Sequence, residues 1–446
     1  MAMPKILKWT LRGLGFVLLA LVLFVLAWVA FNNPLADSKP QPRPAQLLEK
    51  YRDLPAASNG FFTQIGLLSS AGEDPAVAGR GFWAKHQYAA TQGALPLPRD
   101  TVWACDRLTP DCTSQWLQQG DTLARELQSS AEFFRRCTAL ADSADYEELT
   151  LPMTGAAMPE LPRLAPVNLC NKMLRATAVL AAEKGDRVDV VQALTRADHL
   201  ARLQLAGSHT LIGHAVAWSV ARNTWRSAAS LAQRHPELAP ALVRIAQPLT
   251  PAARTAQRWM AYESTFNQST VHWMASACEL PVKEPRGLGD KLWCNFKIGM
   301  LPNATAQAFD QRWSEILAAG ELGMPALLNA PVFTQAKAAS IWSYVHWRNT
   351  MGGVLFAVGR AQYLDYLARQ ADVEMQRQAT ELALRMAAEH VAAGQREDWL
   401  KAQPLPDFVR ARLSFDGNVL VAKPWMADVQ TGELDARYQI RVPLAS

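Results

Sequence analysis

The chain has 446 residues, half of them hydrophobic, so it is long enough to enclose a large core and to form more than one domain. Its net charge is +5, of which Lys5, Lys8 and Arg12 supply three, so the rest of the chain has a net charge of only +2. Because no block of lysine and arginine occurs elsewhere, this composition excludes a nucleic-acid-binding surface.

The first predicted element is an apolar stretch, Gly13–Phe31, that contains no charged residue. At about 1.5 Å per residue, a helix of this length spans about 28 Å, which is close to the thickness of the bilayer hydrocarbon. We therefore predict a transmembrane helix over residues 13–31, with the lipid bilayer as its partner. The cations of residues 1–12 and the mixed charges after the span predict a cytoplasmic N-terminal tail and a single-pass topology.

A cleaved signal peptide is the competing interpretation of the same stretch, with Val25–Ala27 as a small-residue cleavage site. Signal peptides have an apolar core of about 7 to 15 residues, and this stretch is longer. A cut after Ala30 would place the bulky Trp28 at the minus-three position. We therefore favour a signal-anchor over a cleaved segment.

The residues that follow predict a linker and then a helical ectodomain. Residues 32–45 contain four prolines among small polar residues, a composition that favours an extended polyproline-type linker holding the next domain off the bilayer. Residues 46–395 are rich in strong helix formers, and period-two alternation is scarce, so we predict a helical ectodomain there. Its first part alternates short helical runs with glycine and proline breaks.

The strongest helical pattern begins at Asn168. Two predicted helices, Lys172–Glu183 and Val188–Leu205, flank a turn at Gly185-Asp186, an arrangement loosely similar to a tetratricopeptide pair. No 34-residue recurrence accompanies it. We predict a multi-helix domain of this loosely tetratricopeptide-like kind.

The next two predicted helices carry tryptophans at helical spacing, Trp218 with Trp225 and Trp259 with Trp273. Tryptophan faces can stack on glycans or cofactors, but packed helices produce such stripes more often. We expect these four indoles to be structural.

All six cysteines lie after the span, on the side that we assign to an oxidising compartment, and their even number predicts disulfides. Spacing favours neighbours as partners. The disulfide candidates are Cys105 with Cys112, Cys278 with Cys294, and by remainder Cys137 with Cys170. A pair of buried free thiols is the alternative for Cys137 and Cys170. The chain has no C-x-x-C pattern, so neither a zinc ribbon nor a thioredoxin-type centre is indicated.

Histidines are the candidate catalytic residues, but none has a correctly spaced partner. His209 and His214 are five residues apart, which would place them about 140° apart around one helix and not on one face. Asp198 and His199 are adjacent, and neighbours on a helix do not face each other. Glu263 and His272 lie near one face of a helix and could form a buried pair. We assign no catalytic residue, no cofactor and no metal site.

The C-terminal part predicts a long helix and then strands. A predicted helix after Pro331, which carries Trp342 and Phe356 at helical spacing, is interrupted at Gly352-Gly353, where we expect a bend or a close helix crossing. A long helix then runs from Val354 to His390. Residues 396–446 form a small β-rich element, with strands Val409–Phe415, Val419–Ala422 and Tyr438–Val442 around a turn at Asp416-Gly417-Asn418. The predicted fold class is therefore mainly α with a small C-terminal antiparallel β element.

At several scattered positions the sequence resembles a group of uncharacterised bacterial proteins. Those proteins have one N-terminal membrane anchor and a helical periplasmic domain. The similar positions are Asn59-Gly60-Phe61, Glu73-Asp74-Pro75, Asn349, Gly352, Tyr363, Tyr366, Arg369, Asp372 and Phe415-Asp416-Gly417. The resemblance implies a bacterial inner-membrane protein with its bulk in the periplasm. It implies no activity, so it assigns no functional residue.

Two hypotheses for function remain. The first is a helical scaffold or interaction module without catalytic activity, which presents grooves to an envelope protein partner. The alternative is an envelope hydrolase that acts on cell-wall or lipid material in a tryptophan-lined cleft. Convergence of Glu263, His272, His209 or His214 in one open cleft would favour the enzyme, and their dispersal would favour the scaffold.

Overall fold

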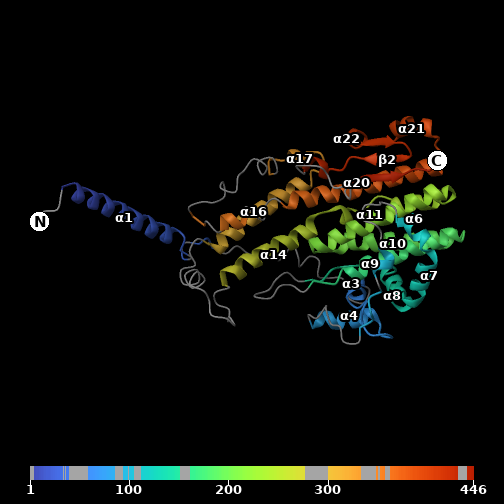
Figure 1. Cartoon of the computed structure of the whole chain (residues 1–446), viewed down its shortest axis with the longest axis horizontal. Helices are drawn as coiled ribbons and strands as arrows, with labels where there is room; N and C mark the ends of the chain where they lie inside the picture. Colours follow the sequence, from blue (N-terminus) through green and yellow to red (C-terminus); the bar gives the residue numbers. More distant parts are fainter. Residues whose placement is uncertain are drawn as a thin grey trace. The chain divides into compact units, whose positions relative to one another are not determined.

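The computed structural model describes residues 5–33, 35, 37–39, 59–85, 94–98, 100–104, 112–150, 161–276, 300–332, 348–349, 352–356, 362–429 and 439–445. In these residues the chain is mainly helical, with one three-stranded antiparallel sheet near the C-terminus, as the sequence predicts (Figure 1). The described residues divide into two compact units. The smaller unit takes its residues mainly from ranges 1–45 and 264–362, and the larger unit from 46–151, 159–263 and 363–446.

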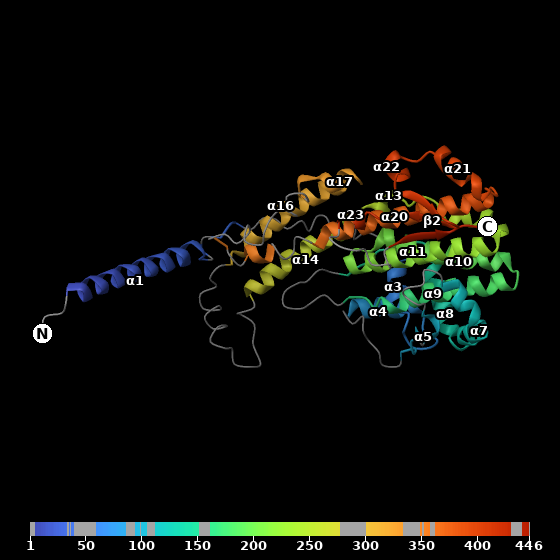
Figure 2. The ribbon, with the colours of Figure 1, turned by 45° about the horizontal axis from the view of Figure 1, so that its top comes forward.

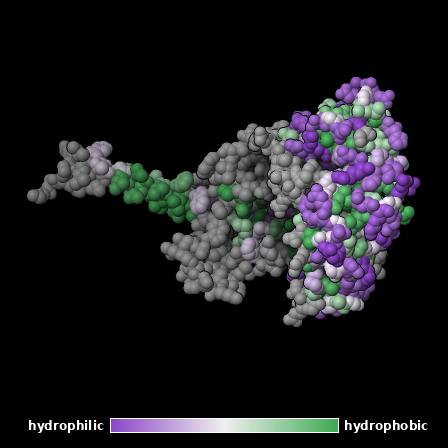
Figure 3. All heavy atoms as spheres, turned by 45° about the vertical axis from the view of Figure 1, so that its right-hand side comes forward, coloured by the Kyte–Doolittle hydropathy of each residue, from purple (hydrophilic) through white to green (hydrophobic). Residues whose placement is uncertain are grey.

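Helix α1 spans Lys5–Phe31 and begins before the apolar stretch. Its segment Arg12–Phe31 has a mean hydropathy of 2.9, and none of that segment is buried. Figure 3 shows the apolar side chains as a continuous green band along the helix. By length and composition, α1 is a single helix that can cross a membrane.

The smaller unit also contains helix α16, Pro302–Gly320, helix α17, Ala326–Asn329, and the C-terminal half of helix α14, Gln257–Ser276. The segment after α1, predicted as an extended linker, is bonded to α16 in its described residues. Asp37 accepts hydrogen bonds from the backbone N–H groups of Asn303 and Ala304 at 2.8 and 2.9 Å, so it caps the N-terminus of α16.

Asn349 lies three residues before the Gly352-Gly353 pair, where a bend or a close crossing was predicted. Asn349 has φ +60°, a left-handed conformation that asparagine tolerates, and its side chain accepts the Leu301 N–H at 2.8 Å. The predicted close crossing is present at Gly352, because a Cβ there would lie 2.1 Å from the Thr305 hydroxyl of α16. Glycine is therefore required at this position.

The larger unit contains the remaining elements. Its helices are α3 Gly60–Ile65, α4 Pro75–Ala84, α5 Asp100–Trp103, α6 Cys112–Gln118, α7 Gly120–Ser129, α8 Ala131–Ala141, α9 Ala165–Glu183, α10 Arg187–Gly207, α11 Leu211–Arg234, η2 Pro236–Leu238, α12 Ala239–Leu242, η3 Val243–Ala246, α13 Pro251–Arg254, α20 Gln362–Ala388, η6 Ala393–Gln395, α21 Arg396–Ala402, α22 Asp407–Arg410 and α23 Met426–Val429. Its strands are β1 Leu413–Asp416, β2 Val419–Ala422 and β3 Ile440–Pro443.

Helices α9, α10 and α11 pack side by side as the centre of the larger unit (Figure 1 and Figure 2). The predicted turn between α9 and α10 is present. Gly185 adopts φ +74°, and the Asp186 side chain caps α10 by accepting the Asp189 N–H. Cys137 of α8 and Cys170 of α9 form a disulfide, and Cys112 is disulfide-bonded as well. Cys105, Cys278 and Cys294 lie outside the described residues.

Three of the four indoles that were predicted to be structural are buried in the larger unit. Trp225 and Trp259 are fully buried and Trp218 is 4% exposed, whereas Trp273 is half-buried. The Trp218 and Trp259 rings meet edge to face, with their centroids 6.4 Å apart. These side chains therefore fill helix interfaces.

Strands β1, β2 and β3 form the sheet in that order, with Phe415 opposite Leu420 and Leu420 opposite Val442. Strand β2 has the predicted bounds, and Gly417 makes the predicted turn with φ +58°. The first strand is shorter than predicted, because Val409 and Arg410 lie in helix α22, which starts after Pro406. The sheet buries one face, and β3 packs against α11.

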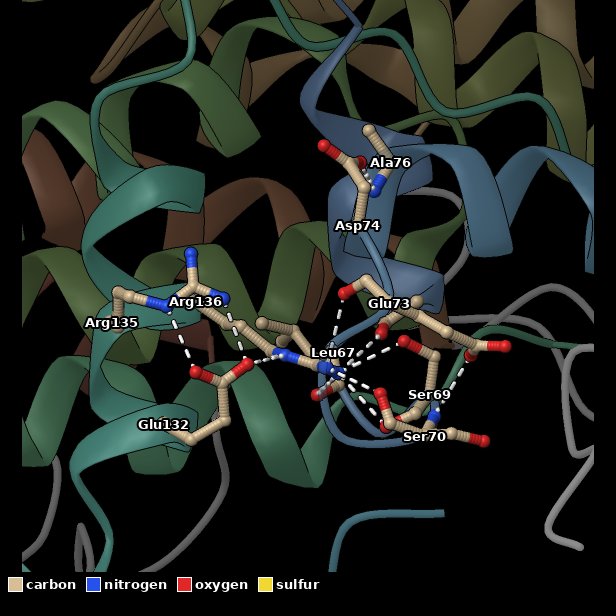
Figure 4. Close-up of polar contacts among 10 residues, drawn as sticks. Leu67, Ser69, Ser70, Glu73, Asp74, Ala76, Glu132, Arg135 and Arg136 are labelled. Atoms are coloured by element: carbon tan, nitrogen blue, oxygen red, sulfur yellow. Dashed lines mark hydrogen bonds and ion pairs between the residues drawn. The ribbon is translucent and has the colours of Figure 1, made fainter. Parts of the chain in front are cut away.

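A buried arginine fixes the loop between α3 and α4. Arg136 of α8 is completely buried and reaches across to this loop, where it donates to a series of backbone carbonyls (Figure 4). The acceptors are Leu67, Ser69, Ser70 and Glu73, at 2.7 to 3.2 Å, together with Gly66 at 3.5 Å and the Ser69 hydroxyl at 2.9 Å. Glu132, one turn earlier on α8, accepts from the Arg136 Nε at 2.9 Å. One guanidinium thus satisfies the carbonyls of a loop that has little secondary structure of its own.

Candidate functional site

A cavity of about 260 Å³ lies between helices α11 and α20 of the larger unit. Its lining combines an apolar wall with three guanidinium groups. The residues are Ala215, Trp218, Ser219, Arg222, Asn223, Arg226, Arg369 and Val373. Ser219 is exposed and the three arginines are half-buried, so the cavity communicates with solvent.

The charges around this cavity are one-sided. Arg222 and Arg226 are four residues apart on α11 and therefore share a face, and Arg369 comes from α20. None of the lining residues that the structure describes is acidic. Behind the cavity, the buried Arg175 of α9 donates to the Asn223 carbonyl at 3.1 Å and adds a fourth positive charge.

Arg226 shows the electrostatic cost of this arrangement. Its Nη2 donates to the Gln439 carbonyl at 3.0 Å, whereas its Nε is buried without an acceptor among the described residues. Burial, together with repulsion from Arg222 and Arg175, lowers the pKa of Arg226 from 12.5 to about 9.

One carboxylate partly offsets these charges. Asp372 of α20 is 3% exposed and accepts the backbone N–H groups of Trp425 and Met426 at 2.5 and 3.2 Å. Burial raises the pKa of Asp372 from 3.8 to about 7, against those two hydrogen bonds and the nearby charges of Arg222 and Arg412. Asp372 therefore fastens the segment before α23 and is a weak counter-ion for the cavity.

Three candidate residues from the sequence, His209, His214 and Glu263, lie in a different place, around the N-terminus of α11. Glu147 binds the His209 Nε2 at 2.5 Å and accepts from Arg258 at 2.7 Å. Its neighbour Glu148 accepts the backbone N–H groups of His209 and Thr210 at 2.8 and 3.1 Å, and the Thr210 hydroxyl at 2.9 Å. We call Glu147, Glu148, His209, Thr210 and Arg258 the carboxylate latch.

Asn59 connects this latch to helix α3. Its side-chain oxygen accepts from the Phe61 and Glu147 backbone N–H groups at 3.0 and 2.8 Å, and its nitrogen donates to the Glu147 carbonyl at 2.7 Å. Asn59 thereby caps α3 and pairs with the extended segment that carries both glutamates. Because Glu147 and Glu148 are 1% exposed, the latch is an internal fastening and not an open cleft.

His209 and His214 do not share a helix, so the helical-wheel argument for this pair was wrong. Thr210 caps α11 by accepting the Gly213 N–H, and the helix begins only at Leu211. His214 is 1% exposed, and neither ring nitrogen has a hydrogen-bond partner among the described residues. Burial and the neighbouring His209 and Arg258 charges lower the pKa of His214 from 6.5 to about 3, so the ring is neutral at physiological pH.

Glu263 approaches the latch from α14 and accepts the Leu211 N–H at 3.4 Å. Burial first, and then the charge of Glu148, raises the pKa of Glu263 from 4.5 to about 7, against the Leu211 hydrogen bond. The proposed Glu263–His272 pair cannot form directly, because nine residues of one helix separate the two by about 13 Å along its axis.

Asp198 and His199 point to different partners, as expected for neighbours on a helix. Asp198 binds Arg202 at 2.5 Å and the Trp225 indole N–H at 2.9 Å, whereas the His199 Nδ1 lies 2.7 Å from the Ala141 carbonyl. Within the described residues, no group of three or more His, Cys, Asp or Glu side chains could hold a metal ion.

Sequence reasoning missed both the latch and the cavity. Glu147 and Arg258 are 111 residues apart, and no local pattern connects them. The i, i+4 spacing of Arg222 and Arg226 was visible, but the same spacing occurs on solvated helix faces. Arg369 was noted in the sequence as a position of resemblance, and the structure places it in the cavity lining.

Comparisons of the chain with protein-family models, with curated proteins and with solved structures find no match in any of the three. The fold therefore defines only a class, a mainly helical protein with one N-terminal helix able to cross a membrane, at least one disulfide and a small C-terminal sheet.

Proposed function

We propose that the protein is a single-pass membrane protein of the bacterial envelope, anchored by α1 with its N-terminus in the cytoplasm. The bulk of the chain then lies in the periplasm. Three features support this topology: the Lys5, Lys8 and Arg12 cluster before the apolar span, the uncharged span itself, and the disulfide between Cys137 and Cys170.

A fusion assay tests the topology. Alkaline phosphatase folds only where disulfides form, so we expect it to be active when it is fused after Ser446. A cytoplasmic reporter fused at the same place should be inactive. The reverse pattern of activities would show that the orientation is wrong.

The proposed activity is binding without turnover, by a helical module that recognises an envelope partner. The placement of the acids and histidines carries this proposal. In the latch, Glu147, Glu148 and His209 are enclosed and bonded to other parts of the protein. The accessible cavity presents guanidinium groups, which retain their proton and so suit recognition better than proton transfer.

The helix arrangement also supports binding. The α9–α10 hairpin packs against α11, and stacked helix pairs present extended surfaces to protein partners. Crosslinking in intact cells, followed by identification of the proteins that travel with this chain, is the direct test of a partner.

The alternative, an envelope hydrolase, has one specific observation in its favour. A carboxyl group with a pKa of about 7 can act as a general acid or base at neutral pH, and Glu263 has such a value beside Glu148. Glu263 also has a structural role, because it accepts the Leu211 N–H at the start of α11. A Glu263→Gln variant separates the two roles, because glutamine keeps the acceptor and abolishes proton transfer.

We expect Glu263→Gln to leave the cellular phenotype and the crosslinked partner unchanged. The variant should also flatten the pH dependence of stability. A carboxyl whose folded pKa is raised binds more protons in the folded state, so its contribution to stability is lost as the pH rises from about 4.5 to about 7. Glu263→Gln should therefore raise the melting temperature at pH 8. Part of the fall in stability with rising pH should remain, because the pKa of Asp372 is raised in the same way.

Glu397→Gln, an exposed position on α21, is the matched control and should change neither the phenotype nor the pH profile. Loss of function in Glu263→Gln, with the circular dichroism spectrum and melting temperature of a folded protein, would replace the binding proposal with the hydrolase.

A further inference from the structure

We propose that the cavity between α11 and α20 is a binding site for a phosphate group, presented either by a free phosphate compound or by a lipid headgroup. This inference rests on the proposed binding function and names the chemistry of one ligand. The residues that would contact the phosphate are Arg222, Arg226 and Arg369, with Asn223 and Ser219 beside them.

The sign of the charge is the first argument. Three guanidinium groups line one small cavity, and Arg175 stands behind it. Like charges in a partly enclosed space repel one another more strongly than on an open surface, because the surrounding dielectric is lower. A phosphate dianion in the cavity would attract all three guanidinium groups and so offset their mutual repulsion, whereas water can only screen it.

The geometry of the donors is the second argument. Arginine carries five N–H donors in a planar fork that matches the oxygens of phosphate, and clusters of arginine are a common form of phosphate recognition. Arg222 and Arg226 offer such forks from one helix face and Arg369 offers a third from α20. The buried Nε of Arg226, which has no protein acceptor among the described residues, is a donor that a phosphate oxygen would satisfy.

The size of the cavity decides how much of a ligand it encloses. Pockets that enclose whole drug-sized molecules measure about 300–1,000 Å³, and this cavity has about 260 Å³. It therefore accommodates a phosphate with a short organic part, or a headgroup whose remaining atoms lie outside. Trp218 and Val373 form the apolar wall that would contact such an organic part.

The test uses the full-length protein in a neutral detergent, with inorganic phosphate and glycerol 3-phosphate as probes and chloride at matched ionic strength as the reference. We expect either phosphate probe to raise the melting temperature in a saturable manner, and chloride to have no saturable effect. Isothermal titration should give a dissociation constant for each probe. Tighter binding of glycerol 3-phosphate shows that the ligand carries an organic group on its phosphate, and tighter binding of inorganic phosphate identifies the free ion. Liposomes of phosphatidic acid, compared with liposomes of phosphatidylcholine alone, then separate a lipid headgroup from a free phosphate ester.

Two pocket variants and one control make the test specific. Arg226→Gln, which keeps a donor for the Gln439 carbonyl, should weaken phosphate binding at least tenfold. Ser219→Trp leaves every guanidinium in place and covers the cavity from an exposed position on α11, so it should also weaken binding at least tenfold. Arg385→Gln removes the same charge from α20 at a position outside the cavity, and binding should be unchanged.

Saturable phosphate binding that fails in both pocket variants and persists in the control establishes the site. The inference is overturned if neither probe binds the wild-type protein at concentrations up to about 10 mM. It is also overturned if folded pocket variants bind as tightly as the wild type. The cellular crosslink and the Glu263→Gln phenotype are measured without added phosphate. The proposed function and the phosphate site can therefore fail independently.

Discussion

Replacing Arg136 with methionine is expected to lower the free energy of unfolding by more than about 4 kcal/mol, because several buried carbonyls lose their donor at once. Each unsatisfied buried polar group costs about 1–3 kcal/mol, and the Arg136 guanidinium serves the whole loop between α3 and α4. Methionine keeps the apolar stem of the side chain, so the loss reports the hydrogen bonds. Urea denaturation followed by circular dichroism measures it.

Arg135→Met provides the matched control for this experiment. Arg135 is adjacent in sequence and also binds Glu132, at 2.8 Å, but its side chain is 61% exposed. An exposed ion pair of this kind contributes little to stability, because solvent screens it. If Arg135→Met and Arg136→Met destabilised the protein equally, the loop between α3 and α4 would not depend on the buried guanidinium.

Replacing Trp225 with alanine should cost about 3–5 kcal/mol, the range measured for removing a large buried aromatic side chain. Trp225 is fully buried on α11, and its indole N–H donates to Asp198 at 2.9 Å. The variant therefore leaves a cavity and removes a donor from a buried carboxylate. Thermal and urea unfolding should both show the loss.

Trp225→Phe divides this loss into its two parts. Phenylalanine fills much of the cavity but cannot donate to Asp198, so the remaining cost, about 1–3 kcal/mol, belongs to the hydrogen bond. Trp399→Ala, at a half-buried position on α21, should cost less than half as much as Trp225→Ala. A Trp225→Ala variant as stable as the wild type would show that the stripe on α11 is not part of the core.

Local patterns in the sequence were sufficient where one segment specifies its own structure. The uncharged run after Arg12 determines helix α1, since a helix satisfies every backbone group within the segment. Gly185 and Asp186 determine the α9–α10 turn by a left-handed backbone and a capping side chain. The period-two pattern and the Gly417 turn gave β2 its bounds.

The local patterns failed where a neighbouring residue changes the interpretation. A strand was predicted from Val409, but the proline before Asp407 starts a short helix, and β1 begins only at Leu413. His209 and His214 were placed on one helix, and the Thr210 cap separates them. Boundaries of this kind depend on a single capping hydrogen bond, which composition does not reveal.

What the sequence by itself determined is therefore the helical class, the apolar N-terminal helix and the small C-terminal sheet, because periodicity and turn chemistry act over a few residues. Only the tertiary structure decided what the polar residues do. Arg136 lies 63 to 70 residues from the carbonyls it binds, and Glu147 lies 62 residues from His209. The arginine cavity likewise exists only because α11 and α20 pack together, which brings distant positive charges to one place.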